Sequence, residues 1–242
     1  MIKLLKKLNV KIFADGADYK SMIELSKKKY IQGLTTNPSL MRKAGVKNYV
    51  NFAKKVLKNI KGKSISLEVF ADTEKEIEKQ ALFLSKLGKN VFVKIPIMNT
   101  KKKYLYKLIN KLSKNGIKLN ITAIMTENQI KNLIKNLNPN VENYISIFCG
   151  RIADTGRDPL PIVKKTKKMI QNKKNFKIIW ASTREVFNIF QANMVKCDII
   201  TVSPNFLSKL NFINYNLEKF SLETVRTFYK DAKNSNYKIP IK

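Results

Sequence analysis

The sequence predicts a single (β/α)8 barrel, an α/β fold in which eight parallel strands alternate with helices. Eight short apolar, β-branched runs recur along the chain, and the intervals between them carry helical periodicity. The first run starts at residue 10 and the last at residue 198, so a strand recurs about every 27 residues, the spacing expected of βα units. No break in composition divides the 242 residues. We therefore expect one domain over 1–242, with 204–242 as a C-terminal helical extension.

An open, doubly wound sheet is the alternative with the same alternation of elements. Sheets of that kind that bind dinucleotides carry a glycine-rich fingerprint after a strand, and none of the predicted strands is followed by one. The barrel is therefore favoured. Its strands are expected at residues 10–15, 31–36, 64–70, 90–96, 117–123, 143–149, 176–182 and 198–202.

Capping residues predict where several helices begin. The helix after the third strand is expected to start at an Asp72 or Thr73 cap, and the helix after the fifth strand at Thr126. The helix after the fourth strand is expected to follow Asn99 or Thr100. A further helix is predicted over 221–231, beyond the eighth βα unit. It is expected either to close the barrel or to dock on a neighbouring subunit, so a homo-oligomer is expected.

Lys94 lies inside the fourth predicted strand, in the run NVFVKIP. An ammonium group in a buried strand loses hydration, and pairing or deprotonation are the ordinary remedies. An amine with a lowered pKa is a nucleophile toward carbonyl groups, which points to Schiff-base chemistry. The alternative is a strand-end lysine whose ammonium reaches water along its aliphatic stem.

Polar side chains stand at the carboxyl ends of the predicted strands, where barrel enzymes carry their chemistry. In chain order they are Asp15, Asn37, Glu68, Lys94, Asn120 with Thr122, Arg151, and Ser182 with Arg184. Each has a structural alternative: Asp15 and Asn37 can start turns, and Ser182 can cap a helix. Glu68 and Lys94 can form a buried ion pair across neighbouring strands. Seven of eight strand ends nevertheless carry such a group, which favours an enzyme.

The formal net charge of +31 comes from 43 lysines and five arginines against 17 acidic residues. The lysines run through nearly every predicted helix, and no single basic stripe with interleaved aromatic residues stands out, so a nucleic-acid partner is disfavoured. The positive field would still concentrate anionic small molecules such as sugar phosphates.

Three of the five arginines, Arg151, Arg157 and Arg184, follow predicted strands. In a chain that uses lysine elsewhere, arginine at these places points to bidentate recognition of phosphate or carboxylate. The alternative is a structural ion pair with Asp154 or Asp158.

Several site classes are excluded by composition. The chain has no histidine and two distant cysteines, Cys149 and Cys197, so neither a zinc-type cluster nor a Cys/His or Ser/His pair can be assembled, and no metal is expected. Cys149 is expected to be a buried thiol in a reducing compartment. No apolar run approaches membrane-spanning length and the N-terminus lacks a signal-peptide core, so a cytoplasmic location is expected.

Six segments, taken together, resemble the transaldolase family, whose relatives include fructose-6-phosphate aldolases and small transaldolase-like proteins. They are GLTTNPSL (33–40), SLEV (66–69), VKIP (93–96), NITA (120–123), GRI (150–152) and ASTRE (181–185). The TTNP and KIP segments together are the most specific. The match follows the order of the predicted strands and covers nearly all of the chain.

The resemblance implies a cofactor-free aldol mechanism. Lys94 would form a Schiff base with a ketose carbonyl, and Asp15 would take the hydroxyl proton that triggers cleavage. Glu68 and Thr122 would hold a water that shuttles protons. The substrate would be bound by two groups of residues: Asn37 and Asn120 on the dihydroxyacetone unit, and Arg151, Ser182 and Arg184 on the phosphate.

Two positions distinguish branches of the family that the chain resembles. Glu68 and Phe148 resemble the residues that transaldolases have at these two positions. Gln and Tyr there would resemble the fructose-6-phosphate aldolases. Phe148 has no hydroxyl to help protonate the carbanionic intermediate, so transfer to an aldehyde acceptor is expected. A lyase that releases dihydroxyacetone is the alternative, and a non-enzymatic polyanion binder is a third hypothesis. Gly16 and the run from Met98 to Lys103 depart from the family pattern and leave the acceptor open.

Overall fold

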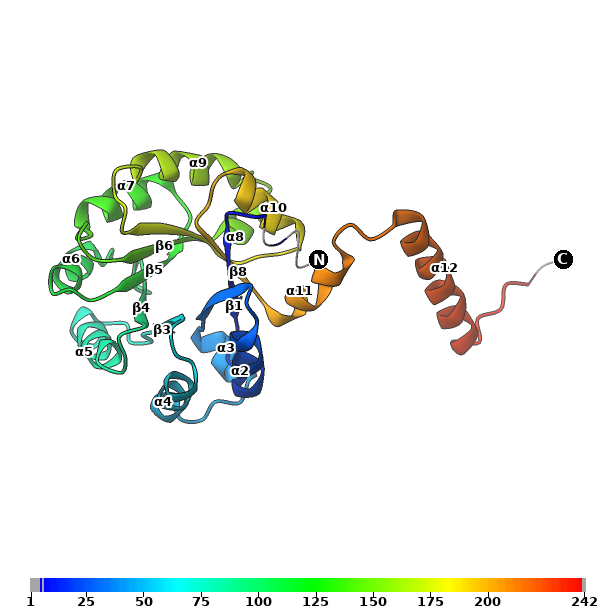
Figure 1. The fold of residues 1–242 in the computed structure, drawn as a ribbon, viewed down its shortest axis with the longest axis horizontal. Coiled ribbons are helices and arrows are strands. Elements are labelled where there is room, and N and C mark those ends of the chain that lie inside the picture. The colour runs from blue at the N-terminus through cyan, green and yellow to red at the C-terminus, as the bar shows by residue number, and fades with distance from the viewer. Residues whose placement is uncertain (1–4, 6, 241–242) are drawn as a thin grey trace.

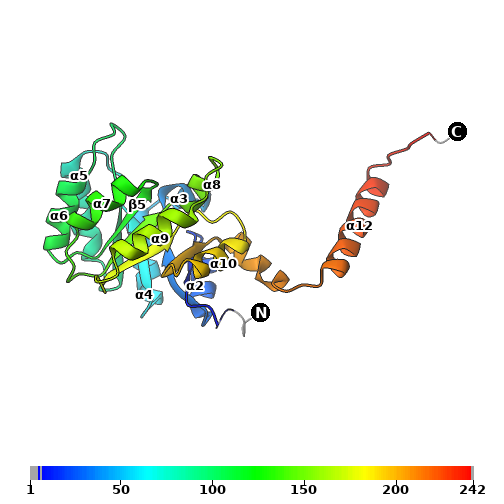
Figure 2. The ribbon, with the colours of Figure 1, turned by 90° about the horizontal axis from the view of Figure 1, so that it is seen from above.

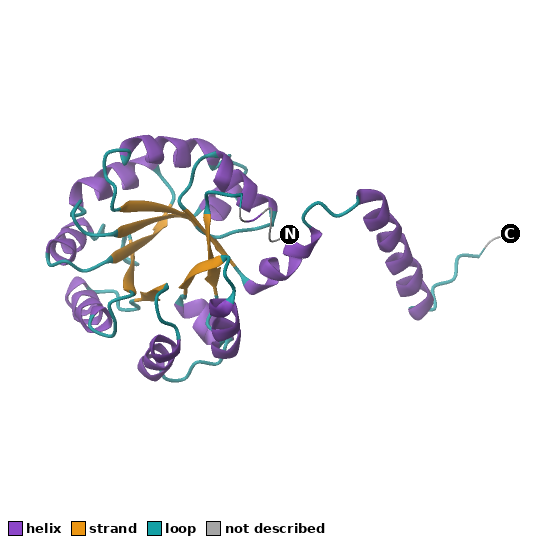
Figure 3. Cartoon of the chain, viewed as in Figure 1, coloured by secondary structure: helices purple, strands orange, loops and turns teal. Residues whose placement is uncertain are grey.

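Eight parallel strands close into a barrel in sequence order, and β1 pairs with both β2 and β8. This computed structural model describes residue 5 and residues 7–240. Figures 1 and 3 show the strands surrounded by a ring of helices. The predicted barrel is thereby confirmed. The strands are β1 (Lys11–Asp15), β2 (Ile31–Thr35), β3 (Ser64–Glu68), β4 (Val91–Pro96), β5 (Leu119–Ile124), β6 (Asn143–Ile147), β7 (Phe176–Trp180) and β8 (Ile199–Val202).

Three strands end two residues earlier than predicted, at Glu68, Ile147 and Trp180. At Ile147 and Trp180 the reason is the local backbone conformation at the carboxyl end of the barrel. After Ile147 the chain turns into a short helix that begins at Cys149, and after Trp180 it reaches Ser182, whose φ is +65°. A strand cannot continue through either conformation.

The helices cover the outside of the barrel and mostly begin at the expected caps. Thr73 and Thr126 are both N-caps, and Thr126 forms a capping box with Gln129. The helices are α2 (Tyr19–Lys27), α3 (Pro38–Lys43), α4 (Tyr49–Asn59), α5 (Glu74–Ser85), α6 (Tyr106–Lys114), α7 (Glu127–Asn136), α8 (Cys149–Ala153), α9 (Leu160–Met169), α10 (Phe187–Met194), α11 (Pro204–Ser208) with the 3-10 turn η1 (Lys209–Phe212), and α12 (Leu217–Asn234).

The predicted start of the helix after β4 was wrong, because α6 begins at Tyr106 rather than after Asn99 or Thr100. The Asn99 side chain instead accepts hydrogen bonds from the backbone N–H groups of Lys101 and Lys103, at 3.1 and 2.9 Å. The Thr100 hydroxyl donates to Asp72 at 2.6 Å. Both candidate caps therefore stabilise a turn, and the helix starts after it.

The extra C-terminal helix that the sequence predicts is present, but it begins earlier than Ser221. Asn216 caps α12 by accepting from the backbone N–H of Lys219 at 2.9 Å. Figures 1 and 2 show α12 extending away from the barrel, and none of its residues is buried. Of the two alternatives for this helix, closing the barrel is excluded, because the pairing of β1 with β8 does so. Among the described helices, none is both long and apolar enough to cross a membrane.

Side chains alternate between the outside and the lumen of the barrel. Outward residues such as Ile65, Leu67 and Val93 pack in the main core between strands and helices. A second cluster, here called the lumen layer, fills the middle of the barrel with Phe13, Phe92, Tyr144, Ile179, Ala181 and Ile199. The lumen layer separates the carboxyl end of the barrel from the amino end.

Aromatic rings dominate the lumen layer. Phe92 stacks on Tyr144 with ring centroids 3.9 Å apart, and Phe13 meets Tyr144 edge-on at 5.9 Å. Gly33 is required beside them, because a Cβ at this position would lie 2.6 Å from the Phe13 ring. The absence of a side chain on β2 therefore makes room for an aromatic ring on β1.

Candidate active site

A cavity of about 630 Å³ opens at the carboxyl ends of the strands, and all residues to which the family resemblance gave a catalytic or substrate-binding role line it. We call it the carboxyl-end cavity. Its predicted lining residues are Lys94, Asp15, Glu68, Thr122, Asn37, Asn120, Phe148, Arg151, Ser182 and Arg184. The topology explains this convergence, because parallel strands in a closed barrel deliver their carboxyl ends to one rim.

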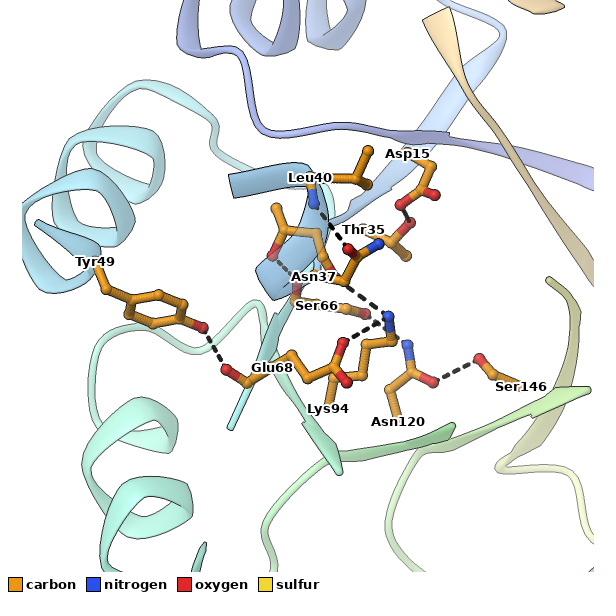
Figure 4. Close-up of polar contacts among 11 residues, drawn as sticks. Asp15, Thr35, Asn37, Leu40, Tyr49, Ser66, Glu68, Lys94, Asn120 and Ser146 are labelled. Carbon is orange, nitrogen blue, oxygen red and sulfur yellow. Dashed lines mark hydrogen bonds and ion pairs between the residues drawn. The ribbon is translucent and has the colours of Figure 1, made fainter. Parts of the chain in front are cut away.

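Lys94 and Glu68 face each other inside the cavity. They are register partners on β4 and β3, so both side chains point into the lumen. Lys94 Nζ lies 2.9 Å from Glu68 Oε2 and donates a hydrogen bond to the Thr36 carbonyl oxygen at 3.2 Å. Figure 4 shows these contacts. Lys94 is only 7% exposed, so it does not reach bulk water as a surface lysine would. The amine is held in a fixed position beside a carboxylate.

Asp15 provides a second carboxylate at the same end of the barrel. It accepts a hydrogen bond from the Thr35 hydroxyl at 2.8 Å. Burial raises the pKa of Asp15 above its ordinary value, while the positive charge of Lys94 and the bond from Thr35 act in the opposite direction. A carboxylate that is poorly hydrated and held by one donor is suited to accept a proton.

A buried polar network fixes Asn120 in the lumen. Its amide nitrogen donates to the Ser66 hydroxyl at 2.9 Å, and the Ser146 hydroxyl donates to its carbonyl oxygen at 2.6 Å. Ser66 lies on β3 and Ser146 on β6, whereas Asn120 lies on β5. Sequence reasoning missed Ser66 and Ser146, although each lies two residues before a predicted site residue and so shares its inward parity with Glu68 or Phe148.

Thr122 lies beside a distortion of β5. The pairing of β5 with β6 is irregular between Ile121 and Ile124, and Ala123 has a φ of +60°. Such a conformation in a residue other than glycine costs about 1–3 kcal/mol and is often found at functional sites. The bulge leaves the Thr122 hydroxyl buried with no hydrogen bond to the described chain, and Glu68 Oε2 likewise makes none, only its ion pair with Lys94. Both atoms are suited to hold a small polar molecule.

From the sequence, Asn37 and Ser182 each have a purely structural alternative, and the structure shows which of them applies. Asn37 is the N-cap of α3 and accepts from the backbone N–H of Leu40 at 2.9 Å, so the turn-forming alternative is present in the structure alongside its place in the cavity wall. Ser182 is not a helix cap, because α10 begins at Phe187 with Val186 as its N-cap. Ser182 instead forms a left-handed bend on the rim.

Arg184 makes the ion pair that was its alternative. Its Nε and Nη2 atoms lie 2.9 and 2.5 Å from the two carboxylate oxygens of Asp154. This hydrogen-bonded pair raises the pKa of Arg184 and lowers the pKa of Asp154. Arg157 does not line the cavity and donates to the Thr155 hydroxyl at 2.9 Å. Arg151 is therefore the arginine at the rim whose guanidinium has no ion-pair partner among the described residues.

Gly150 brings α8 against the loop that holds Ser182. A Cβ at Gly150 would lie 1.6 Å from the Ser182 carbonyl oxygen, closer than any side chain permits. Arg151, the next residue, and Ser182 both line the cavity. Sequence reasoning also missed Lys43, on α3, which adds a further cation to the lining. The many lysines of the chain hide such a residue.

The cysteines lie away from the cavity. Cys149 and Cys197 are free and buried, which confirms the expectation that Cys149 is buried. Burial raises the pKa of Cys197 to about 12. Among the residues that the structure describes, no three histidine, cysteine or carboxylate side chains gather as metal ligands would.

Comparison with known proteins places the chain among enzymes of this architecture. The family model described as "Transaldolase/Fructose-6-phosphate aldolase" matches residues 12–239. A "Probable transaldolase" of Nitrosopumilus maritimus is 30% identical over 96% of this chain and all of its own length. Relatives with the same name from Sulfurihydrogenibium sp. and Methanococcus vannielii are 32% and 31% identical over 83% and 88% of the chain, covering 88% and 94% of their own lengths.

A solved structure supports the fold alone. A putative lyase/mutase from Burkholderia cenocepacia superposes with a TM-score of 0.59 over 98% of this chain and 90% of its own. Its sequence identity is 9%, so the likeness concerns the barrel and not the reaction.

Proposed function

Since the chain belongs to the transaldolase/fructose-6-phosphate aldolase family, we propose that it transfers a dihydroxyacetone unit between sugar phosphates through a Schiff base on Lys94. One observation carries the proposal. A buried lysine amine lies 2.9 Å from a carboxylate inside the cavity at the carboxyl end of a (β/α)8 barrel.

The first step forms the Schiff base. Glu68 takes a proton from the Lys94 ammonium, and the free amine attacks the ketose carbonyl carbon to give a carbinolamine. The carbinolamine hydroxyl then leaves as water. Glu68 Oε2 and the Thr122 hydroxyl are buried and make no hydrogen bond to the described chain, which supports a role in holding the water that carries these protons.

The second step breaks the carbon–carbon bond. Asp15 takes the proton of the hydroxyl beside that bond, the bond electrons move to the iminium nitrogen, and an aldehyde leaves. The remaining enamine stays on Lys94 until an acceptor aldehyde reverses the step. The raised pKa of Asp15 and its proximity to the Lys94 charge support this role.

The remaining lining residues would bind the substrate. Asn37 and the fixed amide of Asn120 would hydrogen-bond the dihydroxyacetone unit. Arg151 and Ser182 would bind the phosphate; both line the cavity, and the Arg151 guanidinium has no ion-pair partner among the described residues, which supports this role. Two nitrogen atoms of the Arg184 guanidinium already donate to Asp154. We therefore assign Arg184 a secondary role in binding the same phosphate.

Transfer is favoured over release because Phe148 lines the cavity and carries no hydroxyl to protonate the enamine. The test is to incubate the enzyme with fructose 6-phosphate, with and without an aldose phosphate acceptor. We expect fructose 6-phosphate to be consumed only when the acceptor is present. Release of free dihydroxyacetone at the same rate without acceptor would support the lyase alternative. Consumption under neither condition would contradict both and would favour the polyanion-binder hypothesis.

The proposal includes a homo-oligomer and a cytoplasmic location. The apolar residues of α12 are exposed in the single chain, with Leu217 at 80% and Phe228 at 68%, which supports docking on a second copy. Sedimentation of the full chain is expected to show an oligomer that a Val225→Asp/Phe228→Asp variant dissociates. An unchanged sedimentation coefficient would contradict the docking. The two buried, free thiols support a reducing, cytoplasmic setting.

A further inference from the structure

The amino end of the barrel holds a second and larger recess, of about 850 Å³. It shares no lining residue with the carboxyl-end cavity. Phe13, Phe92, Tyr144 and Ile199 of the lumen layer form part of its inner wall. The chemistry proposed above does not use this end of the barrel.

Lysines dominate the rim and wall of this recess, which we call the lysine recess. Its ionisable lining consists of eight lysines and two carboxylates: Lys11, Lys61, Lys63, Lys89, Lys118, Lys167, Lys177, Lys196, Glu142 and Asp198. Asp198 is already used in the fold, because it lies 2.6 Å from Lys167 Nζ and accepts from the backbone N–H of Ile178 at 3.0 Å. Glu142 is the remaining acid against seven lysines, one of which, Lys63, donates its ammonium group to the Ser26 and Lys28 carbonyl oxygens.

The lysine-rich composition does not explain the position of three of these residues. Lys11 lies two residues before Phe13, Lys177 two before Ile179, and Lys118 two before Asn120, so all three have inward parity. In most barrels this layer is filled by bulky, branched apolar side chains. Here the starts of three strands carry lysines at inward positions instead.

Lys118 is held in this direction by its surroundings. Its ammonium group donates to the Lys89 carbonyl oxygen at 3.2 Å and lies 5.5 Å from the centre of the Phe92 ring. The wall thus offers a fixed positive charge.

We propose that the lysine recess binds a small anion that carries several phosphate groups, such as a bisphosphate or a triphosphate. Its volume lies within the usual range for small-molecule sites. Its lysines line one concave recess, whereas a nucleic-acid duplex requires cations along an extended surface. Lysine ammonium groups are good point-charge ligands for phosphate, and an anion would offset their mutual repulsion. The inference does not depend on the proposed catalytic function.

Inorganic tripolyphosphate is the probe for the test, with isothermal titration at constant ionic strength. The Lys118→Gln/Lys177→Gln variant removes two inward charges, and Lys54→Gln/Lys58→Gln on the exposed face of α4 is the matched control. We expect one saturable site in the wild type, an affinity at least tenfold weaker in the recess variant, and less than a twofold change in the control. Equal weakening in both variants would overturn the proposal, since it would indicate non-specific attraction.

Two further variants keep the test decisive if the double variant does not fold. Glu142→Gln removes the remaining acid of the recess and is expected to strengthen binding several-fold, the opposite sign to Lys177→Gln. Arg151→Ala, at the other end of the barrel, is expected to leave tripolyphosphate binding within twofold. Loss of binding in Arg151→Ala alone would assign the anion to the carboxyl-end cavity. Displacement of tripolyphosphate by a DNA duplex at equal phosphate concentration would contradict the small-anion proposal.

Discussion

The two ends of the barrel are built by the same eight strands, yet they treat charge in opposite ways. At the carboxyl end opposite charges lie together, as Lys94 does with Glu68 at 2.9 Å, and on the rim Arg184 pairs with Asp154 at 2.5 Å. At the amino end, eight lysines face two carboxylates. The lumen layer separates the two ends. Paired charges fix side chains for chemistry, whereas an excess of one sign suits the binding of a counter-charged ligand.

The comparison predicts that removing the paired lysine has the largest effect. Lys94→Met should lower the transfer rate by about 1,000-fold or more, because no other amine lies beside Glu68 among the described residues. It should also destabilise the fold by about 3–5 kcal/mol, since Glu68 would be left as an unpaired buried charge. Coupled assays and urea unfolding measure the two quantities. If the variant keeps more than a tenth of the wild-type rate, Lys94 is not the residue that forms the Schiff base. The control is Lys58→Met, on the exposed side of α4.

Asp15→Asn should lower the transfer rate by about 100-fold while still allowing the Schiff base to form. The wild-type enzyme should lose activity as the pH falls, because protonated Asp15 cannot accept a proton. Since burial raises its pKa above 3.8, this loss should begin at a higher pH than for an ordinary aspartate. The pH profile of kcat/KM measures the effect. An acid limb that is unchanged in Asp15→Asn would show that another group is responsible.

Two glycines sharpen the comparison between the ends. Gly150→Ala should lower the free energy of unfolding by about 2 kcal/mol or more, because the added Cβ would overlap the Ser182 carbonyl group at the carboxyl rim. Gly62→Ala, in the wall of the lysine recess, should cost only about 1 kcal/mol, since its φ is +74° but no atom lies within 4 Å of the added Cβ. Chemical denaturation of both variants tests the order, and a reversed order would contradict the close contact at the rim.

Arg151→Ala should raise the KM for the phosphorylated substrate by about tenfold and change kcat little, because it removes a ground-state contact to phosphate. Arg157→Ala is the matched control, since its side chain lies outside the cavity. Steady-state kinetics with substrates that differ only in the phosphate would separate the two arginines. Equal effects in the two variants would mean that general charge, rather than position, attracts the substrate.

The smallest predicted effect has the opposite sign to that at Lys94. Lys177→Gln should stabilise the folded protein by about 0.5 kcal/mol at low salt, because it removes one of several like charges. The gain should disappear at about 1 M salt, where such repulsion is screened. Thermal unfolding at the two salt concentrations measures it, and a loss of stability at low salt would indicate that the recess lysines are paired.

Strand parity made much of this arrangement predictable from sequence. The recurrence of β-branched runs predicts the barrel, and inward parity predicts that Glu68 faces Lys94, which the register of β3 with β4 confirms. Strand parity could not predict which of several neighbouring residues caps a helix. Asn99 is used in a turn rather than at a helix start, and Asn216 caps a helix that was predicted to begin only at residue 221.

Features that depend on three-dimensional register were not predictable. The Ser66–Asn120–Ser146 network joins three strands at one level of the lumen, and the bulge at Ala123 sets Thr122 beside it. The lysine recess could not be predicted for a different reason. Its residues come from positions throughout the chain, and only the closed barrel brings them together.

Reduction with borohydride in the presence of fructose 6-phosphate, followed by peptide mass mapping, tests the central claim most directly. A Schiff base on the paired amine should be reduced to a stable adduct on the peptide that contains Lys94, and Lys94→Met should give none. An adduct on another lysine, or no adduct while the enzyme is active, would contradict the account.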